Sequence, residues 1–139
     1  MPDNDLFAAR VESIARCLRR ITDRTPEKPS QLVSNLDAQD IVSVNLQRVI
    51  QISVDLGAHL IVERGWETPT TMAETFDVLA AHGVIDGTLA ERLRRAVGFR
   101  NISVHEYDRI DWERVWVLLT TRLDDFRTFV ARLNALKKN

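Results

Sequence analysis

Apolar residues recur every three or four positions along most of this chain, which is the spacing of one face of an α-helix. A first stripe covers residues 5–23 and consists of Phe7, Val11, Ile14, Leu18 and Ile21. A last stripe covers residues 111–137 and consists of Trp112, Val115, Trp116, Leu119, Leu123, Phe126, Val130 and Leu133. We find no segment with the alternation of a strand. The pattern predicts an all-α protein.

Three more helices are expected between these two. One covers residues 37–64 and is ended by Gly65, and Pro26 and Pro29 mark a loop before it. A shorter helix begins near Thr71 and ends at Gly83. The next begins near Thr88, and both short helices have a glutamate three residues after the threonine, as in a capping box. We therefore expect about five helices in one up-and-down bundle over residues 1–139.

The helix over residues 37–64 is apolar around most of its circumference, which indicates burial on most sides. A narrow polar stripe interrupts it, with Asn45 at its edge. The stripe consists of Arg48, Gln51, Asp55 and His59. It is either a solvated face or a polar seam facing a partner subunit or a cleft, and Asp55 could pair with His59 one turn away.

Composition excludes several protein classes. Hydrophobic residues make up 45% of the chain, and the net charge is -1, so the basic excess of a dedicated duplex-binding protein is missing. Cys17 is the one cysteine, so no internal disulfide forms. No apolar run approaches the length of a membrane span, and residues 1–5 lack the layout of a signal peptide. We expect a cytoplasmic protein without membrane association.

A short segment after the fourth helical pattern has the side chains for phosphodiester chemistry. Arg100, His105 and Tyr107 fall within eight residues there. Arginine carries a permanent charge that forks onto phosphate, and histidine exchanges protons near neutral pH. These are the groups needed to break a phosphodiester without a metal. With three histidines and one cysteine, the chain offers no convincing metal-ligand set, and His82 is expected at a helix end.

The geometry of this segment depends on where the helix ends. Arg100 shares a helix face with Leu93 and Val97 and should point inward. His105 would lie about 140° around a continuous helix from Arg100. The two converge if the helix bends or ends between them, where Gly98 and Ser103 weaken it. Two further residues provide N-caps for the next helix, Asp108 and Asp111.

The order of these residues resembles the Arg-x4-His-x-Tyr motif of the HepT branch of the HEPN ribonucleases. The similarity extends to residues 46–51, 55–60, 76–79, 83–85 and 111–116, and it covers roughly residues 5–135. The resemblance implies Arg100 and His105 as the catalytic pair, with Asn101 and Tyr107 supporting them. It also implies a homodimer whose two motifs face each other across a cleft.

HepT proteins are toxins of two-gene toxin–antitoxin modules and metal-independent endonucleases that act on transfer or messenger RNA. In that family a minimal nucleotidyltransferase of the MntA type silences the toxin by transferring AMP from ATP onto the motif tyrosine. By resemblance, Tyr107 is the AMPylation site, and no cofactor is expected. Of the nearby basic residues, Arg94 and Arg95 are candidate RNA contacts, while Arg92 fits a solvated face equally well. The alternative is a non-catalytic helical module that binds a nucleotide or a protein partner through the same patch.

Overall fold

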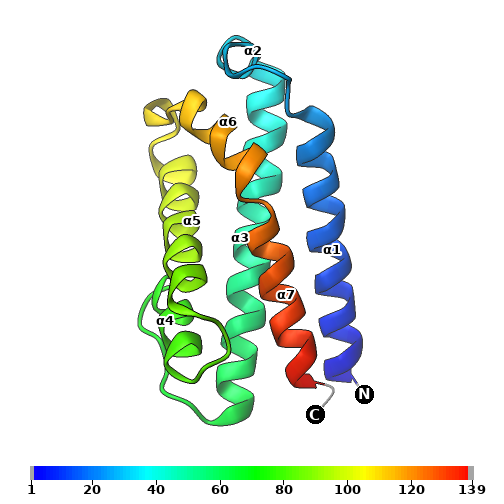
Figure 1. Cartoon of the computed structure of the whole chain (residues 1–139), viewed down its shortest axis with the longest axis vertical. Helices are drawn as coiled ribbons and strands as arrows, with labels where there is room; N and C mark the ends of the chain where they lie inside the picture. Colours follow the sequence, from blue (N-terminus) through cyan, green and yellow to red (C-terminus); the bar gives the residue numbers. More distant parts are fainter. Residues whose placement is uncertain (1, 138–139) are drawn as a thin grey trace.

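The two longest helices lie side by side along the molecule. In the computed structural model, which describes residues 2–137 and their side chains from residue 5, these are α1 (Pro2–Arg24) and α3 (Leu36–Arg64) (Figure 1). The helices α5 (Gly87–His105) and α7 (Asp124–Lys137) pack against α3, and both ends of the described chain lie at one end of the bundle. Residues 1, 138 and 139, which the single-domain prediction includes, lie outside the described part.

The other elements of the bundle are shorter. They are α2 (Pro29–Val33), α4 (Glu74–Ala81), a 3₁₀ turn η1 (Tyr107–Arg109) and α6 (Trp112–Thr121). No strand occurs within residues 2–137, so the predicted all-α bundle is confirmed. The described chain has seven α-helices where the sequence predicted about five.

One additional helix arises because the expected last helix is broken into α6 and α7. The hydroxyls of Thr120 and Thr121 donate to backbone carbonyls one turn earlier, including Val117 O at 3.1 and 2.6 Å. Such bonding bends helices, and the acidic first turn of α7 favours a new start. The Trp116 Nε1–H donates to Pro26 O at 2.8 Å and fixes α6 across the top of the bundle.

The other differences concern helix starts. Pro29 opens α2 instead of extending a loop, because proline suits the first helical position. The N-cap of α5 is Asp86, whose side chain accepts from the Leu89 N–H at 2.8 Å, and not Thr88. The hydroxyl of Thr71 does accept from the Glu74 N–H, at 3.2 Å, although α4 begins only at Glu74.

Helix α4 packs closely on α3 because Gly57 has no side chain. A Cβ at that position would lie 2.8 Å from Thr75 Cγ2 and 3.0 Å from Leu79 Cδ1. Thr75 and Leu79 are both buried, so neither has open space into which to move. The close approach also seats Phe76 edge-on against Phe129, with ring centroids 5.5 Å apart.

Gly57→Ala is therefore expected to lower the free energy of unfolding by about 1 kcal/mol. Overpacking costs about 1–3 kcal/mol, and the better helix propensity of alanine returns at most about 1 kcal/mol. The matched control is Gly98→Ala in α5, where an added Cβ meets nothing within 4 Å and should stabilise the protein. Urea unfolding of both variants measures the difference, and equal stabilisation by both would contradict the packing argument.

Candidate functional site

Arg100 and His105 lie inside α5, and Tyr107 follows in the 3₁₀ turn η1. The helix continues without interruption from Gly87 to His105, and the chain turns only at Glu106. Ser103 does not end it: the helix continues past this residue to His105, and the buried Ser103 hydroxyl donates to Arg100 O at 2.9 Å. Gly98 also remains helical. The condition under which Arg100 and His105 would converge within one chain, a bend or an end of the helix between them, is therefore not met.

Arg100 and His105 are exposed to different degrees on this continuous helix. Arg100 is half-buried, and its Nη1 donates to Asn101 Oδ1 at 3.3 Å. His105, the last residue of α5, is exposed. Within residues 2–137 neither side chain forms an ion pair with a carboxylate. Both groups are therefore available to a ligand, although they lie about 140° apart around the helix axis.

Tyr107 is held against α3 by a residue that the sequence analysis missed. Its hydroxyl donates to Asp40 Oδ1 at 2.7 Å, 67 positions away in the chain. The half-buried ring packs edge-on against Trp112, with centroids 5.8 Å apart. The sequence predicts this hydroxyl close to His105, and in the structure its hydrogen-bond partner is Asp40. The contact depends on the tertiary fold, which brings η1, just after α5, next to the first turns of α3. The sequence alone gives no sign of it.

Burial, and after it the hydrogen bond and negative charge of Asp40, together raise the pKa of Tyr107 to about 12. This folded-state pKa lies above the ordinary value of 10.0. The stabilisation from the protonated phenol is therefore complete below about pH 10 and is lost as the pH rises through 12.

Because Tyr107 is the one tyrosine of the chain, near-ultraviolet absorbance follows its ionisation directly. We expect a midpoint near pH 12 in the folded protein. Asp40→Asn removes the carboxylate charge but leaves the ring buried, so the midpoint should move only part of the way back toward 10.0. An unchanged midpoint in the variant would show that Asp40 does not influence the phenol.

The polar stripe on α3 is only partly covered by the other helices. Arg48 is exposed, whereas Gln51, Asp55 and His59 are half-buried. The suggested Asp55–His59 pair does not form: Asp55 Oδ1 accepts from Gln51 Nε2 at 3.0 Å, and His59 Nε2 lies 3.8 Å from Glu63 Oε2. A solvated face and a partner-facing seam both remain compatible with this arrangement.

The basic residues before the motif have acidic neighbours. Arg94 Nε lies 3.6 Å from Asp77 Oδ1, and Arg95 Nη2 lies 2.9 Å from Glu91 Oε1. Arg94 and Arg95 are both exposed, so their roles as RNA contacts stay predictions. Arg92 pairs with Asp125 at 3.4 Å. His82 is the C-cap of α4, as expected from its place before Gly83, and it stacks on Trp66.

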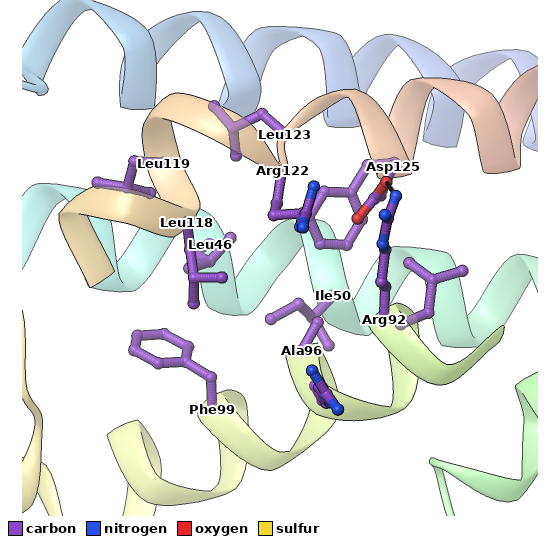
Figure 2. Close-up of a pocket in the computed structure, with 13 residues that line it drawn as sticks. Leu46, Ile50, Arg92, Ala96, Phe99, Leu118, Leu119, Arg122, Leu123 and Asp125 are labelled. Carbon is purple, nitrogen blue, oxygen red and sulfur yellow. Dashed lines mark hydrogen bonds and ion pairs between the residues drawn. The ribbon is translucent and has the colours of Figure 1, made fainter. Parts of the chain in front are cut away.

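An apolar groove, which the sequence did not predict, lies between α3, α5 and the α6–α7 corner. Its volume is about 130 Å³, and Phe99 and Leu118 lie on facing walls (Figure 2). Arg92, Arg122 and Asp125 also line it. In the part of the chain that is described, no three histidine, cysteine or acidic side chains are placed to hold a metal ion. No helix there is long and apolar enough to cross a membrane.

The arrangement of helices in this all-α bundle is that of a solved HEPN toxin. The chain belongs to the family of HepT-like ribonucleases, whose model, "Ribonuclease HepT-like", matches residues 14–133. A Shewanella oneidensis protein named mRNA nuclease HepT is 30% identical, over 95% of this chain and 98% of its own length. The tRNA nuclease HepT of Aphanizomenon flos-aquae is 25% identical, over 94% of this chain and 88% of its own.

Solved toxin–antitoxin structures are also similar to this chain. A tri-AMPylated Shewanella oneidensis HEPN toxin in complex with MNT antitoxin has a TM-score of 0.89 to this chain, with 29% identity. The match covers 94% of this chain and 98% of that one. A toxin–antitoxin structure with AMP-PNP also has a TM-score of 0.89, with 28% identity over 94% of this chain and 98% of that one.

Proposed function

We propose that this chain is the toxin of a two-component toxin–antitoxin module and a metal-independent RNA endonuclease. The observation that carries the proposal is the pair Arg100 and His105 at the exposed end of α5, with no carboxylate partner within residues 2–137. The names of the relatives support RNA as the substrate, with messenger and transfer RNA both among them. We place the protein in the cytoplasm, where both substrates occur.

The proposed chemistry uses the 2′-hydroxyl of RNA as the nucleophile. One His105 removes the proton of this hydroxyl as it attacks phosphorus, and a second His105 protonates the leaving 5′-oxygen. Arg100 binds the phosphate and stabilises the charge that develops in the transition state. The products are a 2′,3′-cyclic phosphate and a 5′-hydroxyl. Arg94 and Arg95 contribute attraction to the RNA backbone despite their acidic neighbours.

The proposed active unit is a homodimer. Because α5 is continuous, Arg100 and His105 of one copy point in different directions. A second copy therefore supplies the histidine that faces Arg100 and the arginine that faces His105. Two exposed apolar side chains favour the surface near Arg100 and Asp40 as the interface. Val104 follows Arg100 by one turn of α5, and Val44 follows Asp40 by one turn of α3. Sedimentation should give twice the chain mass of 15.9 kDa at micromolar concentration. A clean monomer would contradict the shared site.

The proposed regulator is a nucleotidyltransferase antitoxin of the MntA type, which AMPylates Tyr107. The solved complexes of HEPN toxins with MNT antitoxins support this assignment, one of them with an AMPylated toxin. An adduct on Tyr107 places a phosphodiester charge and an adenosine at the end of α5. It would compete with RNA phosphate for Arg100 and fill the cleft.

Expression with and without a neighbouring nucleotidyltransferase gene tests the proposal, with growth and total RNA integrity as readouts. We expect growth arrest and RNA breakdown when the chain is expressed alone, and neither when the partner is present. Intact RNA in arrested cells would instead favour the alternative, a non-catalytic module that binds a nucleotide or protein.

A further inference from the structure

The hydrogen bond between Tyr107 and Asp40 lies at the atom that modification would change. The phenol oxygen is 2.7 Å from Asp40 Oδ1, and the phenol is the donor. Asp40 is exposed on α3 and forms no ion pair among the described residues, so its carboxylate is accessible to water. The two groups come from helices far apart in sequence, and the contact is set by the tertiary fold.

A phenol must lose its proton when its oxygen attacks phosphorus. With the pKa of Tyr107 at about 12, only about one molecule in 10⁵ is ionised at pH 7. Attack through the preformed phenolate is therefore disfavoured in this protein. A base that receives the proton during the attack avoids that cost, and it must already be within hydrogen-bond distance of the hydroxyl.

We propose that Asp40 is the proton acceptor for nucleotidylation of Tyr107, an inference that rests on the proposed function. The phenol oxygen forms a bond to the α-phosphorus of a nucleoside triphosphate, and the bond from that phosphorus to the pyrophosphate oxygen breaks. The hydroxyl proton passes to Asp40 Oδ1, and the exposed carboxyl then releases it to water. Pyrophosphate leaves. Asp40 thus takes part in the regulatory reaction by accepting the proton of the Tyr107 hydroxyl.

The contact could instead only hold η1 against α3, and one substitution separates the two roles. Asp40→Asn keeps an acceptor oxygen for the phenol but is far too weak a base to take its proton. The matched control is Asp37→Asn, which removes the same charge one turn earlier on the exposed side of α3. Neither change deletes a buried apolar group, so both variants should fold.

The experiment mixes each purified full-length protein with the nucleotidyltransferase partner and Mg²⁺-ATP. Intact-protein mass measures the single-turnover rate of AMP addition, and peptide mass assigns it to Tyr107. Affinity for the partner without nucleotide is measured separately. We expect Asp40→Asn to slow AMP addition by about 100-fold or more, the range of a lost general base. Partner affinity should stay unchanged, and Asp37→Asn should react at the wild-type rate.

The possible failures are distinguishable. Equal rates for Asp40→Asn and wild type would overturn the role of Asp40 and leave the proposed regulation standing. Slow AMP addition to an Asp40→Asn protein that also binds the nucleotidyltransferase weakly would overturn the role of Asp40 as well. The defect would then lie in partner binding and not in proton transfer. A wild-type protein that binds its partner but never gains AMP on Tyr107 would overturn the proposed regulation and the inference together.

Discussion

Arg100→Ala and His105→Ala will each abolish toxicity while leaving the helical bundle folded. The loss of transition-state stabilisation or of proton transfer should lower RNA cleavage by at least about 10²–10³-fold. Neither side chain belongs to the buried core, so the free energy of unfolding should change by only about 0.5 kcal/mol. Growth after induction measures toxicity, and urea unfolding measures the fold.

The matched control for these variants is Arg132→Ala, which removes an exposed arginine from α7, away from the motif. It should remain as toxic as wild type, which separates the role of Arg100 from a general loss of positive charge. Full toxicity of either Arg100→Ala or His105→Ala would show that the catalytic assignment is wrong.

Tyr107→Phe is expected to stay toxic and to escape the antitoxin. The ring can keep its edge-on contact with Trp112, and only the hydroxyl and its bond to Asp40 are lost. That bond is near the surface, so its loss should cost about 1 kcal/mol of stability. Without the hydroxyl, no oxygen remains to accept AMP.

Co-expression with the nucleotidyltransferase measures the escape, and peptide mass spectrometry checks that the wild-type Tyr107 peptide gains mass in AMP-sized steps. Trp112→Phe is the matched control, since it alters the same contact but leaves the hydroxyl in place. If the partner still neutralised Tyr107→Phe, inhibition would work by occlusion of the site and not by modification.

Helical periodicity predicted the bundle because each buried stripe is local. Ile14, Leu18 and Ile21 are all buried on α1, as their spacing indicated. The same argument failed at the α6–α7 corner, where Leu119 and Leu123 are both buried although the helix breaks between them. A stripe that continues across a kink has the spacing of a single helix, so periodicity alone does not locate the break.

The site was predictable only as far as it lies in one segment. The order of Arg100, His105 and Tyr107 identified the motif, but Gly98 and Ser103 were expected to weaken a helix that in fact continues to His105. The buried Ser103 hydroxyl is satisfied by the backbone one turn earlier. Asp40 carried no signal, since its partner is 67 residues away and an aspartate near a helix start has an ordinary role as a helix-end charge.

RNA cleavage by the purified protein in EDTA tests the central claim most directly, with wild type and Arg100→Ala compared side by side. We predict that wild type cuts RNA without metal and leaves 2′,3′-cyclic phosphate and 5′-hydroxyl ends, and that Arg100→Ala yields no such product. Wild-type cleavage that is lost in EDTA and restored by magnesium, or equal cleavage by Arg100→Ala, would contradict a metal-independent ribonuclease built on Arg100 and His105.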